Sequence, residues 1–92
     1  MVNAILESED VMTKKIMIVD DDPTITKYLN VLFKDNGYET CIAENGKDAV
    51  DVYKKESPDL ITLDLEMPEE WGPRFFRKAS KIKGFNTPVI VI

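Results

Sequence analysis

Residues 16–23 read IMIVDDDP, and this stretch decides the fold. Its first half belongs to a run from Lys15 to Val19 that lacks the alternation of a strand with one solvent face, so it predicts a strand buried on both faces. Asp22 followed by Pro23 is a strong helix start, because an aspartate caps the first amides and proline suits the first helical position. The segment therefore predicts a buried strand that leads directly into a helix.

The alternation of strand and helix continues along the chain. Further strands are predicted at residues 38–43, 60–63 and 88–92, a second helix after Asn45 and Gly46, and a third that opens at Pro73. Gly37 is predicted to end the first helix. The expected apolar faces are Ile25, Leu29, Leu32 and Phe33 for the first helix and Phe75, Phe76, Ala79 and Ile82 for the third. Short right-handed crossovers then give an α/β fold with a doubly wound parallel sheet.

The composition excludes several classes of function. The chain has 92 residues, 12 Lys and Arg against 17 Asp and Glu, a net charge of −5, no His and one Cys. The usual zinc sites and catalysis by Ser-His-Asp or Cys-His groups are therefore excluded. Cys41 has no partner for an internal disulfide and is expected to be a small buried apolar residue. The acidic balance argues against nucleic acid and anionic membranes, and no apolar run could span a bilayer. These features predict one reduced, cytoplasmic domain.

Aspartates follow the first and third predicted strands, as Asp20, Asp21 and Asp22 and as Asp64. The carboxyl ends of parallel strands open at one edge of a sheet, so these carboxylates would meet there if the two strands are neighbours. Oxygen ligands without His or Cys favour Mg²⁺ or Mn²⁺, and one Asp is then available as a nucleophile for phosphoryl transfer. Taken alone, Asp20 to Asp22 fit helix caps and solvated charge equally well.

Two motifs give the chain a family resemblance. The segment 16–23 and the segment 59–68, which reads DLITLDLEMP, resemble those of bacterial response-regulator receiver domains, and residues 87–92, TPVIVI, continue the pattern in order. The resemblance covers a receiver domain at residues 14–92 and leaves residues 1–13 as a leader. It implies a flavodoxin-like sheet with strand order 2-1-3-4 in this chain. It also implies phosphorylation of one Asp by a histidine kinase or phosphotransfer protein.

The resemblance also implies a role for each acidic residue. By position, Asp64 would be the phosphoacceptor, and Asp20, Asp21 and Asp64, with the backbone carbonyl of Glu66, would bind Mg²⁺. Asp22 would mainly cap the helix. Such a domain assists its own phosphorylation and dephosphorylation and is otherwise not an enzyme. The added charge switches a surface that a downstream output domain or protein reads.

The sequence departs from the family pattern in two places. Glu70, Trp71 and Gly72 stand where the family usually has Asp-Gly, and because the glycine is retained, the turn there is expected to be retained. Trp71 is expected to pack on the loop beside the active edge, with binding to a partner as the alternative. The family's Ser or Thr after the fourth strand, its fifth strand ending in Lys and its fifth helix do not occur in the 92 residues. Three explanations fit this difference: a fragment of a full receiver, a truncated receiver, or a receiver completed by exchange of segments between subunits. We expect the fragment. Its fourth strand would be a flat apolar edge that invites pairing with a second copy, forming a homodimer.

Two other functions fit parts of the sequence. Residues 20–24, DDDPT, also fit the D-x-D-x-T pattern of haloacid-dehalogenase-like phosphatases, in which Asp20 would be the nucleophile and Asp22 the acid/base. A third hypothesis is a receiver-like binding or dimerisation module that takes no phosphoryl group. The basic residues opposite the phenylalanine stripe are expected to form a solvated helix face, so direct binding to DNA is not predicted; they are Arg74, Arg77, Lys78 and Lys81.

Overall fold

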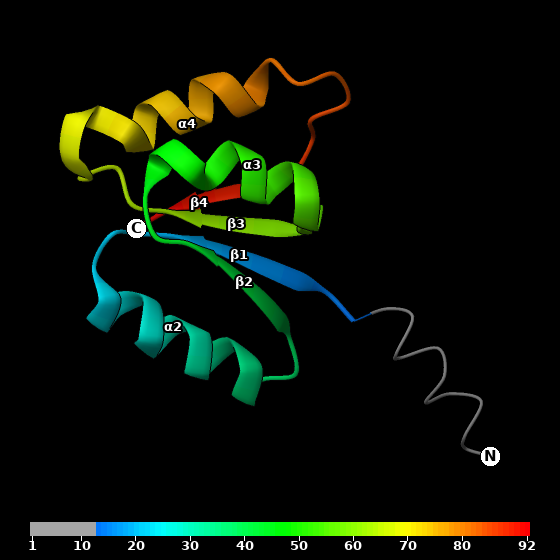
Figure 1. Cartoon of the computed structure of the whole chain (residues 1–92). Helices are drawn as coiled ribbons and strands as arrows, with labels where there is room; N and C mark the ends of the chain where they lie inside the picture. Colours follow the sequence, from blue (N-terminus) through cyan, green and yellow to red (C-terminus); the bar gives the residue numbers. More distant parts are fainter. Residues whose placement is uncertain (1–12) are drawn as a thin grey trace.

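A computed structural model describes residues 13–92, in which strands and helices alternate (Figure 1). The elements are β1 (Lys15–Val19), α2 (Pro23–Asp35), β2 (Glu39–Ala43), α3 (Gly46–Glu56), β3 (Leu60–Leu63), the 3₁₀ helix η1 (Pro68–Glu70), α4 (Trp71–Ser80) and β4 (Val89–Val91). The strand bounds differ from the predicted ones by at most one residue at either end. The predicted leader, residues 1–13, lies outside the described residues except for Thr13. Within the described part, no helix is long and apolar enough to cross a membrane.

The four strands form one parallel sheet in the order β2-β1-β3-β4. In β1, Val19 is in register with Ala43 of β2 on one side and with Leu63 of β3 on the other. α2 lies on one face of the sheet, and α3 and α4 lie on the other (Figure 1). The predicted doubly wound α/β fold with strand order 2-1-3-4 is confirmed. β1 and β3 are neighbours, so their carboxyl ends lie side by side.

Side-chain caps set the starts of α2 and α3. The Asp22 carboxylate accepts the Thr24 N–H at 2.8 Å, which confirms the predicted cap of α2. Asn45 caps α3 in the same way, accepting the Asp48 N–H at 2.8 Å. After α2 the chain turns at Gly37, whose φ of +90° lies in the left-handed region that glycine adopts without a steric penalty. The local sequence therefore determines where α2 and α3 begin.

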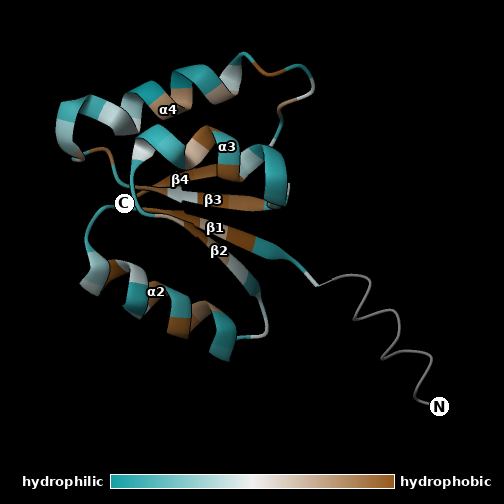
Figure 2. Cartoon of the chain, in the orientation of Figure 1, coloured by the Kyte–Doolittle hydropathy of each residue, from teal (hydrophilic) through white to brown (hydrophobic). Residues whose placement is uncertain are grey.

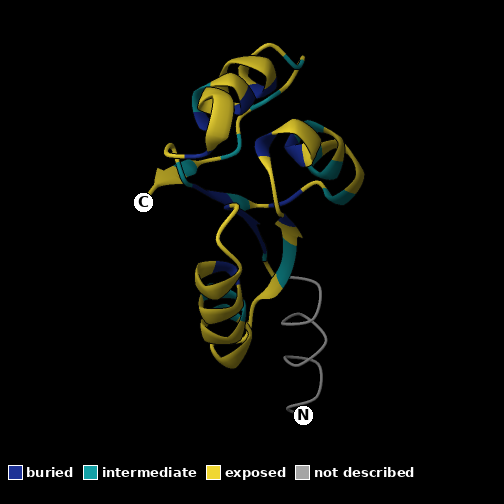
Figure 3. Ribbon diagram, turned by 60° about the vertical axis from the view of Figure 1, so that its left-hand side comes forward, coloured by how far each residue is buried: buried dark blue, intermediate teal, exposed yellow. Residues whose placement is uncertain are grey.

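The main core lies between the sheet and the pair α3 and α4. The central strands contribute Met17, Val19, Ile61 and Leu63, which pack against Ala49, Phe75 and Ala79 of the helices. The strands form a largely apolar layer with polar helix surfaces outside it (Figure 2). Its two central strands, β1 and β3, are the most buried part of the described chain (Figure 3). Residues 16–19 of β1 are all buried, so the strand is covered on both faces as predicted.

The third helix differs from the prediction in its start and in its face. α4 begins at Trp71, two residues before the predicted start at Pro73, and η1 directly precedes it. Phe75 is fully buried but Phe76 is 44% exposed, so the prediction of Phe76 as a core residue was wrong. Each helical step turns a side chain by about 100°. With Phe75 seated on the sheet, Phe76 therefore turns to a groove beside β4, which Val91 also lines.

The apolar face of α2 is also less buried than predicted. Ile25 and Leu32 are exposed, Leu29 and Phe33 are half-buried, and the buried residue of the helix is Thr26. The Thr26 hydroxyl donates to a backbone carbonyl of the preceding turn at 3.1 Å, so its polar group is satisfied and the side chain can face the sheet. Among the described residues no second helix lies beside α2, which leaves the outer part of its apolar face without a neighbour (Figure 3).

Cys41 of β2 is half-buried and packs against the core. Burial raises the pKa of its thiol from 9.0 to about 11, with a smaller contribution from the negative charge of Glu56. At pH 8 we expect the thiol of the native protein to react with a disulfide reagent about 100-fold more slowly than that of the urea-unfolded chain, because the thiolate is the reacting form. Absorbance kinetics measure both rates directly, since the chain has one cysteine. Equal rates would show that the thiol is not desolvated.

Candidate functional site

The backbone brings two strand ends to the same point of the sheet. Val19 and Leu63 are in register, so the residues that follow them, Asp20 and Asp64, leave neighbouring strands together. The Asp64 N–H donates to the Val19 carbonyl at 3.0 Å, and the Asp20 N–H donates to the Ala43 carbonyl at 3.3 Å. Both aspartates are thus held by backbone hydrogen bonds that extend the sheet pairing by one residue.

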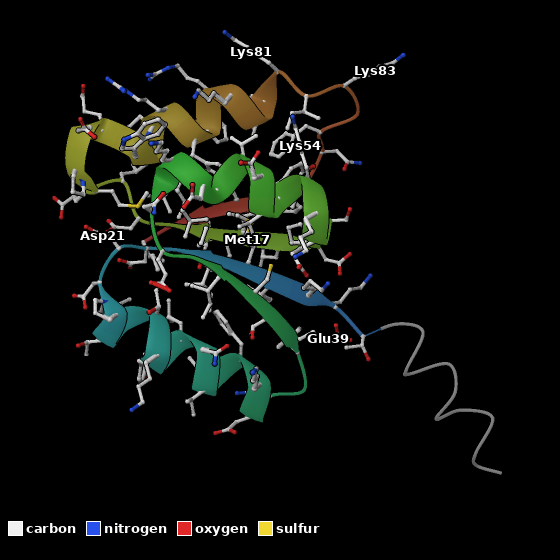
Figure 4. The ribbon with its side chains drawn as sticks, in the orientation of Figure 1. Met17, Asp21, Glu39, Lys54, Lys81 and Lys83 are labelled. Atoms are coloured by element: carbon white, nitrogen blue, oxygen red, sulfur yellow. The ribbon has the colours of Figure 1, made fainter. Side chains whose placement is uncertain are left out.

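The carboxylates of Asp20, Asp21 and Asp64 form an acidic cluster at this edge. One oxygen from each lies within 4.8 Å of the others. Asp20 is only 4% exposed, Asp64 is half-buried and Asp21 is exposed. Asp21 lies where the chain leaves β1 for α2 (Figure 4). The structure therefore brings together the three side chains that the sequence placed at two separate strand ends.

The buried member of the cluster is electrostatically strained. Burial raises the pKa of the Asp20 carboxyl, and the negative charges of Asp64 and Asp21 raise it further. The Asp22 N–H, which donates to Asp20 Oδ1 at 2.9 Å, acts in the opposite direction by favouring the ionised form. The net effect is a carboxylate whose negative charge is less stable in the folded protein than in water. A bound cation would relieve this strain.

The donor set fits Mg²⁺ or Mn²⁺. The cluster offers carboxylate oxygens alone, which hard divalent cations prefer, and the chain has no His to favour zinc. Oxygens on one such ion lie about 2.1 Å from it, and so at most about 4.2 Å apart. The observed separations, within 4.8 Å, require only small side-chain rotations. Asp20, Asp21 and Asp64 are the residues that would hold the ion.

The loop that follows Asp64 orients its carboxylate. The Glu66 N–H donates to Asp64 Oδ1 at 2.9 Å, closing a tight turn around the side chain. Met67 is buried in the core and thereby anchors the loop to it. Asp64 therefore has one carboxylate oxygen held by its own loop. Sequence reasoning assigned Glu66 a carbonyl role and missed the role of its N–H.

Sequence reasoning also missed the reason for Gly72. The prediction was a glycine that preserves a turn, but Gly72 is the second residue of α4. A Cβ at this position would lie 2.5 Å from the Asp64 carbonyl oxygen and 2.6 Å from the Leu65 Cα. Only glycine lets the helix approach the loop after β3 this closely. No local sequence pattern predicts this contact, because it joins two separate segments that meet only in the folded chain.

Comparisons with known proteins agree with this architecture. The chain matches the response regulator receiver domain family over residues 16–92. It is 39% identical over 82 residues to Protein Rrf1 of Nitratidesulfovibrio vulgaris strain Hildenborough, a match covering 88% of this chain and 59% of that protein. It is 40% identical over 81 residues to sporulation initiation phosphotransferase F of Bacillus subtilis strain 168, covering 88% of this chain and 64% of that protein.

Solved structures show the same fold. The receiver domain of the Francisella response regulator 1452 superimposes with a TM-score of 0.77 at 32% identity, covering 86% of this chain and 64% of the other. Chemotaxis response regulator CheY4 of Vibrio cholerae gives a TM-score of 0.80 at 28% identity, covering 86% and 67%. The chain thus spans less than two thirds of the length of the sequence relatives above. Together with the strand order and the motif match, these similarities show that the chain belongs to the response regulator receiver domain family.

Proposed function

We propose that this chain is the phosphoacceptor part of a two-component signal-transduction system, with Asp64 as the acceptor. The observation that carries the proposal is the convergence of Asp64 with Asp20 and Asp21 at the carboxyl edge of a receiver sheet. The phosphoryl donor would be a histidine kinase or a phosphotransfer protein. Asp20, Asp21 and Asp64, together with the backbone carbonyl of Glu66, would hold Mg²⁺ or Mn²⁺.

In the proposed reaction an oxygen of Asp64 attacks the phosphorus of a phosphohistidine. A P–O bond forms, the P–N bond of the donor breaks, and the histidine nitrogen leaves with the electron pair. The Glu66 N–H holds Asp64 Oδ1, which leaves Oδ2 as the attacking atom. The divalent ion, when bound, supplies positive charge that neutralises the phosphoryl oxygens. The added phosphoryl charge then biases a surface that an output domain or protein reads.

The simplest test uses a small phosphodonor. The metal-free chain is incubated with acetyl phosphate, with and without Mg²⁺, and its intact mass is measured. We expect the mass of one phosphoryl group to be added with Mg²⁺ and none after chelation. A folded chain that binds Mg²⁺ but gains no mass would contradict phosphoacceptor function and favour the non-phosphorylated binding module.

The phosphatase alternative is not supported by the arrangement of Asp20 and Asp22. Asp20 is only 4% exposed, whereas a nucleophile in that role should be accessible to its substrate. Asp22, the acid/base of that scheme, accepts the Thr24 and Ile25 N–H groups as the cap of α2. Both residues therefore fit the receiver reaction better.

Location and assembly complete the proposal. A cytoplasmic location fits a partner that transfers phosphoryl groups between signalling proteins. Exposed Ile90 and Val91 lie in β4, which is at the edge of the described sheet. Pairing of this edge with a second copy remains a prediction, which the concentration dependence of the molecular mass in solution would check.

Removing a cluster carboxylate should change metal-dependent stability. Because the pKa of Asp20 is raised in the folded state, Asp20 favours folding at pH values below its unfolded pKa, and this contribution is lost as the pH rises through the folded pKa. At pH 7.5 we therefore expect Asp20→Asn to raise the free energy of unfolding of the metal-free protein. Mg²⁺ at about 100 times its Kd should stabilise the wild type by about 2.7 kcal/mol and Asp20→Asn far less. Urea unfolding with and without Mg²⁺ measures both effects.

Asp22→Asn is the matched control. It removes one negative charge beside the cluster but retains a side chain that caps α2 well. We expect its Mg²⁺-dependent stabilisation to stay close to that of the wild type. Equal losses for Asp20→Asn and Asp22→Asn would mean that Mg²⁺ responds to the general acidity of this edge and that Asp20 is not a ligand.

A further inference from the structure

Residues 69–72 lie between the loop that begins at Asp64 (residues 64–67, the acceptor loop) and the start of α3. On one side, a Cβ on Gly72 would lie 2.5 Å from the Asp64 carbonyl oxygen. On the other side, a Cβ on Gly46 would lie 2.5 Å from the Trp71 Cβ and 2.8 Å from the Trp71 carbonyl oxygen. Gly46 and Gly72 thus permit close contacts on both sides of the peptide that joins Trp71 to Gly72. The position of Asp64 is therefore coupled to the position of Trp71.

The indole of Trp71 is fixed from several directions. Its Nε1–H donates to Glu69 Oε1 at 3.2 Å. The Arg74 guanidinium and the Lys78 ammonium lie 5.2 Å and 5.0 Å from the ring centroid, within the range of cation–π attraction. The side chain also packs against the core beside α3. The ring therefore anchors the N-terminus of α4 through a hydrogen bond, two cations and apolar contact.

The chain just before Trp71 would not hold this position by itself. Glu69 and Glu70 have φ values of 59° and 58°, the left-handed region that non-glycine residues rarely adopt. Each such residue costs of order 1 kcal/mol and persists only where surrounding contacts hold it. The contacts of the Trp71 ring come directly after these two residues in the chain, so they are the contacts that hold the segment in place. Without the ring, this segment should relax away from the acceptor loop.

We propose that Trp71 is a positioning residue for the acceptor carboxylate. Its ring keeps Gly72 against the Asp64 backbone, and this contact keeps the Glu66 N–H on Asp64 Oδ1. Its effect on phosphoryl transfer rests on the function proposed above, whereas its effect on the Glu66 hydrogen bond does not. The two effects are therefore tested separately.

The first test is amide hydrogen exchange, measured by NMR on the metal-free protein. We expect Trp71→Ala to speed exchange of the Glu66 amide about fivefold or more, because local opening is then easier. The Asp22 amide is an internal reference, because it donates to Asp20 Oδ1 at the same distance, 2.9 Å, at the end of the other strand. Its exchange should not change. Trp71→Phe keeps an aromatic ring under Arg74 and Lys78 and should restore most of the protection.

The second test is the rate of phosphorylation by acetyl phosphate at saturating Mg²⁺. Misplacement of a reacting group by about 1 Å can slow a reaction about 100-fold. We expect a smaller shift in Trp71→Ala, which lowers the rate about tenfold. Phe85→Ala is the matched control. Phe85 is also a half-buried aromatic residue packed on the core, but its ring contacts that of Tyr53 near the far end of α3, at 5.3 Å between ring centroids. It should lower stability without changing the rate.

Gly46→Ala tests the same coupling with Trp71 intact. A methyl group here would push the Trp71 backbone away, although helix propensity alone predicts that alanine stabilises α3. We expect faster exchange of the Glu66 amide in this variant too. If Trp71→Ala does not fold, Gly46→Ala alone tests whether the position of Trp71 controls the Glu66 hydrogen bond. Unchanged Glu66 exchange in both variants, or equal rate losses in Trp71→Ala and Phe85→Ala, would overturn the proposal. If the wild type takes no phosphoryl group, the proposed function fails, and Glu66 exchange still decides the role of Trp71.

Discussion

Asp64→Asn should leave the protein folded and remove its phosphorylation completely. The amide oxygen of Asn can still accept the Glu66 N–H, so the loop after β3 keeps its hydrogen bond. The amide is not a nucleophile toward phosphorus, so no phosphoryl group is transferred. Stability of the metal-free protein should be equal or higher, because the charge of Asp64 contributes to the raised pKa of Asp20. Intact mass after incubation with acetyl phosphate and Mg²⁺, and thermal unfolding, measure the two effects.

Asp59→Asn is the control for this variant. Asp59 precedes β3 at its other end and accepts the Lys15 N–H at 2.9 Å, which is the same kind of contact that Asp64 makes. The change from carboxylate to amide is identical, but Asp59 lies outside the acidic cluster. We expect Asp59→Asn to be phosphorylated like the wild type. Phosphorylation that survives in Asp64→Asn would mean that another residue is the acceptor.

Of the four Gly→Ala substitutions in the chain, Gly72→Ala should be the most destabilising. Its Cβ would lie 2.5 Å from the Asp64 carbonyl oxygen and 2.6 Å from the Leu65 Cα, and both are backbone atoms that cannot rotate away. The helix and the acceptor loop would have to separate, and we expect a loss of about 3 kcal/mol in the free energy of unfolding. Stabilisation by Mg²⁺ should fall as well, because Asp64 moves with its backbone. Urea unfolding with and without Mg²⁺ measures both.

Gly84→Ala separates steric contact from backbone strain. Gly84 has a φ of +84°, but a Cβ there would meet nothing within 4 Å. We expect a cost of about 1 kcal/mol, which reflects the left-handed conformation alone. A loss in Gly72→Ala no larger than that in Gly84→Ala would show that α4 can move away from Asp64 without a large penalty. The close approach would then have little structural importance.

Much of the fold was predictable because its signals are local. The continuous apolar run at residues 16–19 predicts a strand covered on both faces, and Asp22 with Pro23 predicts the helix start. Alternation of such segments leaves few topologies, because crossovers between parallel strands are right-handed. The meeting of Asp20 and Asp64 follows once β1 and β3 are neighbours. The acidic edge could therefore be predicted from the sequence once the family resemblance supplied the strand order.

The start of α4 and the approach of Gly72 were not predictable in this way. The apolar pattern favours Phe75 and Phe76 equally, and the choice between them depends on how the helix is seated on the sheet. That seating depends on backbone contacts of Trp71 and Gly72 with residues distant in sequence. Positive φ values at Glu69 and Glu70 move the helix start to Trp71, although neither residue type signals such a conformation. Contacts formed only in the folded chain therefore determine this part of the site.

The most direct test of the account is to locate the phosphoryl group on the chain. The protein is phosphorylated with acetyl phosphate and Mg²⁺, the acyl phosphate is trapped by borohydride reduction, and the modified residue is identified by peptide mass spectrometry. We predict modification at Asp64, dependent on Mg²⁺, with Asp20 and Asp21 unmodified. Modification at Asp20, or none on a folded chain that binds Mg²⁺, would contradict Asp64 as the acceptor.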